Sequence, residues 1–367
     1  MTTSGQARRA LFLALLAAIV FCASPPIAAG DDRVAEAWPG ESWDRVMPEE
    51  AGWGLDRLEE ARAYSQHIGT ASFIVAQHGR IVASWGDIGR RHELHSVRKS
   101  LLSALIGVAV ADGRIHLDAT LASLGVDDVA PSLSDAEKQA TVRQLLQSRS
   151  GVYHVANYET DGERRLRPER GAHPPGAFWY YNNWDFNALG SIYERAAGAS
   201  IFEAFASVVA TPLGMEDYRA SDGRYVTGPA STHPAYPFRM SARDLARFGL
   251  LYLRGGRWRD RQLVPASWVR ESTTAWSETH ARSGYGYLWW TGYPDRRVAV
   301  MDLPPGGFWA DGALGQFIVV DTPDDLVVVH QTAGADVGMR QMGHLMWLIL
   351  NAAHARDPGT DPDPSGD

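Results

Sequence analysis

The sequence predicts an α+β protein in which one antiparallel sheet is flanked by helices and carries an inserted, mostly helical region. Short apolar segments typical of strands occur near both ends of the 367-residue chain, whereas its middle has helical spacing and long loops. Strands from the two ends can bury their apolar faces by pairing with each other, so we expect a single sheet built from both ends. Functional sites tend to lie between such halves.

The first elements of this arrangement are a helix, a hairpin and a second, buried helix. Apolar residues at helical spacing predict the first helix over 55–67. Two strand-like segments then flank a turn at Gly79. The residues from Ser96 to Val110 are apolar nearly all round, which predicts a buried helix that ends at Gly113. The two strands are expected at 72–77 and 81–85.

The inserted region extends from about 115 to 280, and strand signals return after it. Within it, Ser241 and Asp244 resemble a capping box at the start of a helix that continues through Tyr252. The tail at 356–367 is rich in Asp, Pro and Gly and is expected to be disordered, so the folded domain is predicted to span 31–355. The late strands are expected at 285–290, 316–320 and 326–330, and the last helix at 337–354.

The N-terminal segment 1–30 has the features of a secretory signal peptide. Arg8 and Arg9 precede an apolar run at 10–23, and small residues follow up to Gly30. The apolar run is short for a membrane span. We therefore expect a periplasmic or secreted protein with no stable membrane partner after cleavage. The alternative is an uncleaved segment that anchors the chain to a membrane.

The composition excludes several classes of protein. Cys22 is the only cysteine, so the mature chain would have no disulfide, thiol nucleophile or thiolate metal site. A lipoprotein site at Cys22 is disfavoured by the bulky Phe21 before it. The formal net charge of −8 without a basic stripe gives no basis for nucleic-acid binding. His92 and His95 lack the spacing of a zinc-protease motif, so we expect no metal.

A serine and a lysine three residues apart are the strongest catalytic signal. Only Lys99 and Lys138 are lysines among the 35 basic residues. A surface cation can be arginine, but an amine that must lose its proton cannot, because guanidinium stays charged in proteins. Residues three apart on a helix share a face, so Ser96 and Lys99 can meet, and burial lowers the pKa of a lysine. The alternative is that Ser96 only caps the helix and Lys99 extends its amine to solvent.

A third element lies in the aromatic-rich segment 178–190. Tyr181 precedes Asn183 by two residues, which can supply a phenol for proton transfer and an amide that holds a carbonyl group. The segment also has the composition of a packing element. We therefore regard Tyr181 as a candidate partner of Ser96 and Lys99.

Together these segments resemble the class C β-lactamase-like serine hydrolases, which share the fold of penicillin-binding proteins. Residues 96–100 resemble the nucleophile segment, 181–190 the Tyr-x-Asn segment with its trailing Leu-Gly, and 239–249 a further common stretch. The resemblance extends from about 46 to 350. It implies that Ser96 is the nucleophile, that Lys99 and Tyr181 share its proton, and that no cofactor is used. It leaves open which of the two is the base.

The resemblance also implies roles for residues near the substrate, with one departure. Asn183 would orient the substrate carbonyl or amide. The third family motif is Lys or His, any residue, then Gly, and its best match here is Ala310-Asp311-Gly312. Gly312 would let the backbone approach the substrate, and the N–H groups of Ala313 and Ser96 would form the oxyanion hole. The missing cation removes the usual anchor for a substrate carboxylate, and Asp311 would favour a neutral or cationic substrate.

We therefore predict an exported serine hydrolase that cleaves a small ester or amide through an acyl-enzyme on Ser96. The absence of a Lys or His two residues before Gly312 makes the sequence more similar to esterases and 6-aminohexanoate-dimer hydrolase-like members of the family. One alternative is a β-lactamase or D,D-peptidase, which Ala310 and Asp311 disfavour. Another is a catalytically weak binding protein on the same fold, although a binding pocket has no need of an amine that can lose its proton.

Overall fold

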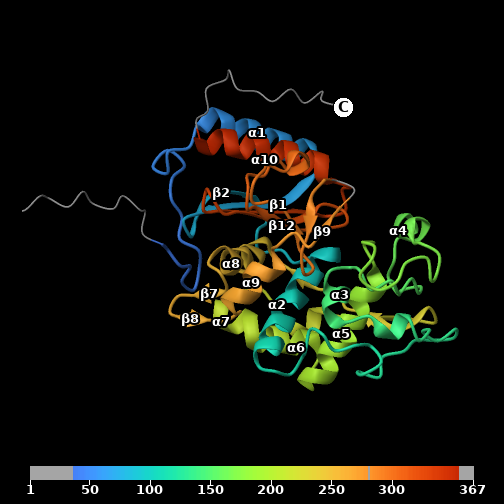
Figure 1. The fold of residues 1–367 in the computed structure, drawn as a ribbon. Helices are drawn as coiled ribbons and strands as arrows, with labels where there is room; N and C mark the ends of the chain where they lie inside the picture. Colours follow the sequence, from blue (N-terminus) through green and yellow to red (C-terminus); the bar gives the residue numbers. More distant parts are fainter. Residues whose placement is uncertain (1–35, 280–281, 355–367) are drawn as a thin grey trace, which may run out of the picture. The chain divides into compact units, whose positions relative to one another are not determined.

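An eight-stranded antiparallel sheet is the central element of the computed structural model, which describes residues 36–279 and 282–354 (Figure 1). The strand order is β2-β1-β14-β13-β12-β11-β10-β9, and neighbouring strands pair antiparallel throughout. β1 therefore lies between β2 and the last strand, β14, so the sheet combines strands from both ends of the chain, as predicted. The bounds are β1 Thr70–Gln77, β2 Arg80–Gly86, β9 Ser277–Glu278, β10 Gly284–Tyr285, β11 Trp290–Thr291, β12 Phe308–Gly312, β13 Gln316–Asp321 and β14 Leu326–Thr332.

Two sequence predictions fall outside this description. The predicted signal peptide and the predicted disordered tail at 356–367 lie beyond the described residues. The residues from Glu36 onward form one unit by their contacts.

The hairpin of β1 and β2 forms where the sequence predicts it. His78 and Gly79 in its turn have φ values of 50° and 77°. Two positive φ values in a two-residue loop match the right-handed twist of the strands. A side chain at Gly79 would place Cβ 1.9 Å from the carbonyl oxygen of Ala37, so the turn also requires glycine for space.

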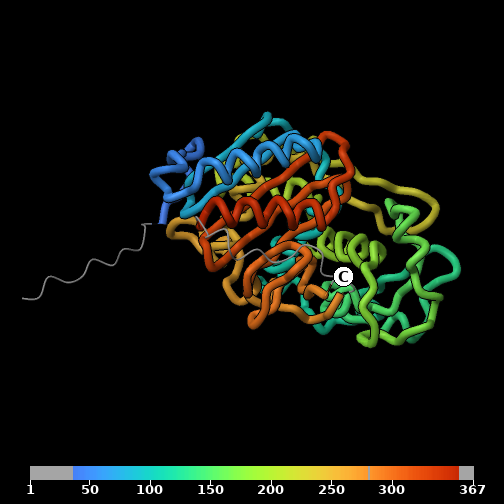
Figure 2. Tube along the Cα trace, turned by 90° about the horizontal axis from the view of Figure 1, so that it is seen from above, coloured from blue at the N-terminus to red at the C-terminus, as the bar shows by residue number. Residues whose placement is uncertain are grey.

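Alternating side chains of the sheet enter two separate cores. Phe73 and Val75 pack with α1 (Leu55–His67) and α10 (Met339–His354) on one face. Figures 1 and 2 show these two helices side by side, although they come from opposite ends of the chain. Ile74 and Ala76 belong to the core on the other face, which contains the helical region. Strands covered on both faces become apolar throughout, and all residues of β13 and β14 are buried.

The inserted region consists of helices and short strand pairs below the second face of the sheet (Figure 1). α2 (Arg98–Ala111) runs into this core, and 11 of its 14 residues are buried, as the all-round apolar pattern predicts. It is followed by Asp112 and by Gly113, whose φ is 70°. The further α-helices of this region are α3 Val142–Leu146, α4 Asp161–Leu166, α5 Asn183–Ala197, α6 Ile201–Phe205, α7 Thr211–Leu213, α8 Ala242–Leu253 and α9 Ala266–Ser272. The strand pairs are β3 His92–Glu93 with β6 Arg239–Met240, β4 Val226–Gly228 with β5 Ser231–Ala235, and β7 Arg257–Trp258 with β8 Arg261–Gln262.

The strand predicted at 285–290 was wrong, because two short strands with a turn between them occupy this segment. Tyr285 ends β10 and Trp290 begins β11, and the two residues pair with each other. Leu288 in the turn has a φ of 64°. A Cβ at Gly286 would lie 2.0 Å from the Ser272 carbonyl oxygen, so the chain turns where it packs against α9. Apolar periodicity does not report such a backbone contact.

The capping box predicted at Ser241 is only half formed. Ser241 caps α8, since its Oγ accepts a hydrogen bond from Asp244 N at 3.3 Å. The Asp244 carboxylate instead accepts hydrogen bonds from the backbone N–H groups of Glu216 and Asp217, at 2.8 and 3.0 Å. The acid therefore ties α8 to a neighbouring loop.

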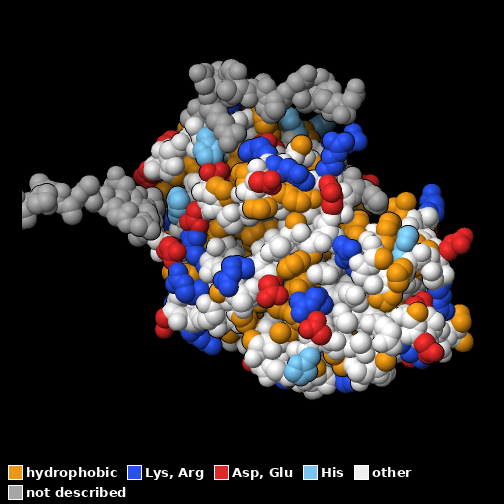
Figure 3. Space-filling view, in the orientation of Figure 1, with side chains coloured by type: hydrophobic (Ala, Val, Ile, Leu, Met, Phe, Trp, Pro, Cys, Tyr) orange, Lys and Arg blue, Asp and Glu red, His pale blue; other side chains and the backbone are white. Residues whose placement is uncertain are grey.

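The described helices and the surface drawn in Figure 3 were compared with the features of a membrane span and of a single-sign charged patch. Within 36–279 and 282–354, no single helix has both the length and the apolar composition of a membrane span. The segments Asn183–Ala197 and Ile201–Leu213 meet these criteria only as a pair bent by 71°. On the face drawn in Figure 3, basic and acidic side chains are interspersed.

Candidate active site

Ser96 lies in a single 3₁₀ turn, His95–Val97, immediately before α2. The residue before it, His95, has a φ of 47°, a left-handed conformation that is unfavourable for a residue with a Cβ. Val97 is the N-cap of α2 and makes no side-chain cap. The structure therefore does not support the alternative that Ser96 serves as a helix cap.

Lys99 brings Ser96 and Tyr181 together. Its Nζ donates hydrogen bonds to Ser96 Oγ and to Tyr181 Oη, each at 2.7 Å. The residue is only 2% exposed, so its amine does not extend to solvent. Nζ also lies 4.4 Å from the ring centre of Tyr181 and 4.7 Å from that of Phe186. The three residues predicted for catalysis thus form one contiguous group.

The surroundings of Lys99 favour its neutral form. Burial holds its pKa well below the ordinary value, and the nearby Arg98 guanidinium lowers the pKa further. The carboxyl groups of Glu163 and Asp311 act in the opposite direction. Because the lowering influences dominate, Lys99 loses its proton at a lower pH than an exposed lysine does, and the neutral amine can then accept a proton.

Tyr181 precedes α5 and is held among aromatic rings. Its ring stacks on Trp290 at 5.6 Å and meets Phe186 edge-on at 5.0 Å. Burial raises the pKa of its phenol above the ordinary value, and the negative charge of Glu163 adds to this effect. Tyr181 is therefore a protonated phenol at neutral pH, suited to pass a proton on.

The two asparagines after Tyr181 have different surroundings. Asn182 is the N-cap of α5: its Oδ1 accepts a hydrogen bond from Trp184 N at 3.2 Å, and its Nδ2 donates to Val152 O at 2.7 Å. Asn183 is buried in the first turn of α5, and its side chain hydrogen-bonds the carboxylate of Glu163. The structure thus places Asn183 next to a group that also acts on Lys99.

Glu163 is the site residue that the sequence analysis missed. It belongs to α4 and closes a capping box, because one of its carboxylate oxygens accepts hydrogen bonds from the N–H and Oγ1 of Thr160, both at 2.8 Å. Burial disfavours its charge, but Lys99 and these hydrogen bonds keep its pKa below the ordinary value. The sequence signal of Thr160 and Glu163 is that of a helix start, which explains the omission.

Gly312 ends β12 directly against the nucleophile segment. A Cβ at this position would lie 2.3 Å from Leu94 O and 3.2 Å from Ser96 N, so any side chain would push the strand away. The next residue, Ala313, is exposed. The close approach places the backbone of β12 beside the amide of Ser96, in the arrangement expected for an oxyanion hole.

The turn that contains Ala313 is held by hydrogen bonds from residues of β14. Leu314 has a φ of 58°, and its carbonyl oxygen accepts a hydrogen bond from Thr332 Oγ1 at 2.5 Å. The carbonyl oxygen of Gly315 lies 2.8 Å from Nδ1 of the fully buried His330. Such bonds can hold an unfavourable backbone conformation in place. They give the Ala313 amide a defined position at the end of β12.

Asp311 is half-buried on β12 and is expected to destabilise the fold at alkaline pH. Burial raises its pKa from 3.8 to about 7, although Lys99 acts against this shift. The native state therefore retains a proton between about pH 4 and 7 that the unfolded chain has lost, and stability falls as the pH rises through this window. Asp311→Asn should raise the Tm, with a larger gain at pH 8 than at pH 5. Thermal unfolding at both values checks this, and equal gains would contradict the assignment.

The two histidines before Ser96 point to different partners. His92 Nε2 lies 3.4 Å from Ser72 Oγ, whereas His95 Nδ1 lies 3.4 Å from the hydroxyl of Tyr158. In the described part of the chain, no group of three or more His, Cys, Asp or Glu residues is placed to hold a metal ion.

A comparison with protein families decides the relationship. The family model described as Beta-lactamase matches residues 55–350. The chain belongs to the beta-lactamase family. This match includes Ser96, Lys99, Tyr181 and the segment that ends β12.

Similar proteins include an esterase and solved structures with the same fold. Esterase EstB from Burkholderia gladioli is 26% identical over 197 residues, which cover 44% of this chain and 50% of the esterase. The match thus spans only half of that relative. A provisional 6-aminohexanoate-dimer hydrolase from Bacillus anthracis has a TM-score of 0.65 at 19% identity, with 88% of this chain and 89% of that chain covered. A penicillin-binding protein homologue from Caulobacter crescentus has a TM-score of 0.61 at 17% identity, with 82% and 99% covered. These two structures share the fold.

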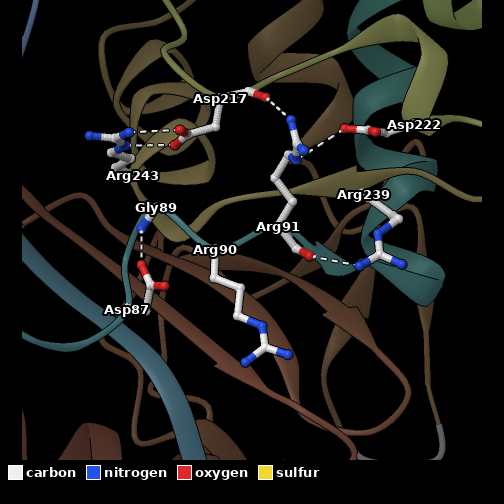
Figure 4. A pocket seen from close by; sticks show the side chains of 8 residues that line it. All are labelled: Asp87, Gly89, Arg90, Arg91, Asp217, Asp222, Arg239 and Arg243. Carbon is white, nitrogen blue, oxygen red and sulfur yellow. Dashed lines mark hydrogen bonds and ion pairs between the residues drawn. The ribbon is translucent and has the colours of Figure 1, made fainter.

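A separate polar hollow of about 790 Å³ contains none of the catalytic candidates (Figure 4). Its arginines are largely engaged within the hollow itself. Arg243 Nε donates to the Asp217 carboxylate at 2.6 Å, Arg91 pairs with Asp222 at 3.1 Å, and Arg239 donates to the Arg91 carbonyl oxygen at 3.1 Å. These contacts join the residue before β3, β6, α8 and the segment 217–222, so we regard the hollow as a structural junction of this chain.

Proposed function

We propose that this beta-lactamase-family chain hydrolyses small esters or amides through an acyl-enzyme on Ser96. The observation that carries the proposal is the position of Lys99 Nζ, 2.7 Å from both Ser96 Oγ and Tyr181 Oη, in a chain with only two lysines. A buried amine between a serine hydroxyl and a phenol is an arrangement for moving a proton.

In the acylation step, Lys99 acts as the general base. Its neutral amine takes the proton of the Ser96 hydroxyl while Oγ attacks the substrate carbonyl carbon. The amides of Ser96 and Ala313 stabilise the negative oxygen that develops. The bond to the leaving group then breaks, and the leaving group receives a proton through the Tyr181 hydroxyl, which the Lys99 ammonium replenishes.

Deacylation uses the same groups with water as the nucleophile. Lys99 takes a proton from water through the Tyr181 hydroxyl as the water oxygen attacks the acyl carbon, and the Lys99 ammonium returns a proton to Ser96 Oγ as the ester bond breaks. The raised pKa of Tyr181 supports its role as a relay, because a phenol that stays protonated is a poor primary base. Asn183 would orient the carbonyl or amide of the substrate.

A β-lactamase or D,D-peptidase activity is the second candidate. The family match and the penicillin-binding protein homologue favour it. Asp311 speaks against it, since such substrates carry a carboxylate and the family usually places a cation in this strand. Hydrolysis of a chromogenic cephalosporin at a rate similar to that of a neutral ester would favour this second candidate.

The proposal is tested by the intact mass of the protein after incubation with a fluorophosphonate probe. We expect one adduct per chain on the wild type, located by peptide mapping at Ser96, together with turnover of neutral p-nitrophenyl esters. A wild-type protein that is folded but takes up no adduct would contradict the proposal. It would favour a binding role instead.

Export to the periplasm or beyond the cell is a further part of the proposal. It is supported by Arg8 and Arg9 before the apolar run and by the small residues that follow it. The N-terminal sequence of the protein recovered from the periplasmic fraction tests it, and a chain that begins at Met1 in a membrane fraction would indicate the uncleaved anchor.

A further inference from the structure

We propose that the active site selects substrates by charge, with Asp311 and Glu163 favouring a cationic leaving group and disfavouring an anionic one. The inference rests on the proposed function and names a substrate class for it: esters and amides with an ammonium group close to the bond that breaks. The sequence motif indicates a role for Asp311. The position of Glu163, and the arrangement of both acids around Lys99, are visible only in the folded structure.

The two carboxyl groups reach the reaction centre from different elements. Asp311 comes from β12, the strand that ends beside Ser96, and Glu163 comes from α4 in the inserted region. Both lie close enough to act electrostatically on Lys99 and on Tyr181. Two negative groups around one proton relay create a negative potential where the substrate must bind.

The neighbouring arginines are not available to bind a substrate anion directly. Arg98 also acts on Lys99 and Tyr181, but it is only 1% exposed. Its guanidinium carbon lies 5.5 Å from the ring centre of Tyr158 and 5.0 Å from that of Tyr236, and its Nη1 donates to His95 O. A substrate carboxylate therefore cannot reach the Arg98 guanidinium.

A second arginine near the nucleophile segment is already paired. Both terminal nitrogens of Arg224 donate to the carboxylate of Glu93, at 3.1 and 3.2 Å. The hydroxyl of Tyr158 donates to the same carboxylate. Arg224 is thus paired with Glu93. It therefore does not replace the cation that the family has before the glycine of β12.

Aromatic rings beside Tyr181 add an attraction for a positive charge. Trp290 stacks on Tyr181, and Trp179 lies edge-on to Trp290 at 6.0 Å. Both tryptophans remain partly exposed. The faces of such rings attract ammonium groups within about 6 Å. The site therefore combines negative charge with ring surfaces, a combination that suits an alkylammonium group and opposes a carboxylate.

Three thioesters that differ in the charge of the leaving group test the inference. Butyrylthiocholine is cationic, S-(3,3-dimethylbutyl) thiobutyrate is its neutral isostere, and S-(2-carboxyethyl) thiobutyrate is anionic. Thiol release is measured at pH 8, where Asp311 is ionised because its pKa is about 7. We expect kcat/KM to fall in the order cationic, neutral, anionic, with about a tenfold or larger difference between the extremes.

Variants assign this preference to the two acids. Asp311→Asn and Glu163→Gln should each lower the ratio of cationic to anionic kcat/KM several-fold, and Asp311→Lys should invert it. Asp161→Asn is the matched control, because Asp161 is an exposed carboxylate on the same helix as Glu163 that pairs with Arg164. This control should keep the wild-type ratio.

The outcomes separate this inference from the proposed function. If the neutral fluorophosphonate does not label Ser96, the proposed function fails. If Ser96 is labelled and the three thioesters react equally, or if the ratio of cationic to anionic kcat/KM is unchanged in both single variants, the charge-selection inference is wrong. If the probe labels Ser96 but the enzyme turns over none of the three thioesters, each thioester is tested as a competitor of the labelling reaction. The cationic compound should then slow the labelling most and the anionic compound least. The absence of that order also overturns the inference.

Discussion

Replacement of Ser96 by alanine is expected to abolish the probe adduct and to reduce ester kcat/KM by roughly 10⁴-fold or more. Loss of the nucleophile in a serine hydrolase removes the covalent route altogether, and what remains is catalysis from binding and oxyanion stabilisation. Cys22 is the only cysteine in the sequence and lies in the segment predicted to be a signal peptide, so we expect no thiol to replace Ser96 as the nucleophile.

The fold should survive this substitution. Ser96 lies in a 3₁₀ turn and does not cap α2, so its hydroxyl makes no structural bond to the helix backbone. Its side chain contacts two other catalytic candidates, Lys99 Nζ and the Tyr181 hydroxyl. We therefore expect the thermal unfolding of Ser96→Ala to remain close to that of the wild type while its activity is lost.

Ser103→Ala provides the matched control for this experiment. Ser103 lies on α2 and is fully buried, and its side chain lies against Tyr252, which is not one of the catalytic candidates. This variant should keep both the adduct and the turnover. An adduct that persists in Ser96→Ala would show that a different residue is the nucleophile, and the proposed mechanism would have to be abandoned.

The parts of the fold that sequence reasoning predicted are those that local periodicity controls. The helix over 55–67 coincides with α1, and the hairpin of β1 and β2 follows from two strand-like segments and one glycine turn. The Ser96–Lys99 contact is also local, because a spacing of three residues on one helical turn brings their side chains together. Such features need no knowledge of distant contacts.

The parts that could not be predicted depend on contacts far apart in the sequence. The turn within 285–290 forms because Gly286 packs against the Ser272 carbonyl oxygen, which the order of apolar residues does not report. Glu163 has the local pattern of a helix start, and its position near Lys99 depends on the path of the whole segment between α3 and α5. The environment of a titratable group is therefore a property of the tertiary structure.

Lys99→Arg is expected to lower kcat/KM by about 10³-fold or more, in the range that a general base contributes. Arginine keeps a positive charge in the same place but cannot lose its proton at any pH used in the assay. The substitution therefore separates the charge of Lys99 from its function as a base. If Lys99 only provided a positive charge, arginine would preserve a large part of the activity.

The pH dependence gives a second, independent readout. Burial and Arg98 hold the pKa of Lys99 well below its ordinary value, and the active form is the neutral amine. The labelling rate of the wild type should therefore rise with pH and be lost as the pH falls through the Lys99 pKa. In Lys99→Arg and Lys99→Met the residual rate should lack this rise, because neither side chain can exchange a proton in this range.

Two further variants exclude simpler explanations. Lys138→Arg is the matched control, since Lys138 is the other lysine and forms a partly exposed ion pair with Asp127 at 2.7 Å. It should retain full activity. Lys99→Met keeps a side chain of similar length without the amine. A loss of activity without a fall in Tm therefore shows that the variant lacks the proton acceptor and that its packing is intact. If Lys99→Arg retained wild-type kcat/KM and the same pH profile, Tyr181 would have to be the base, and Lys99 would serve only to hold its hydroxyl beside Ser96.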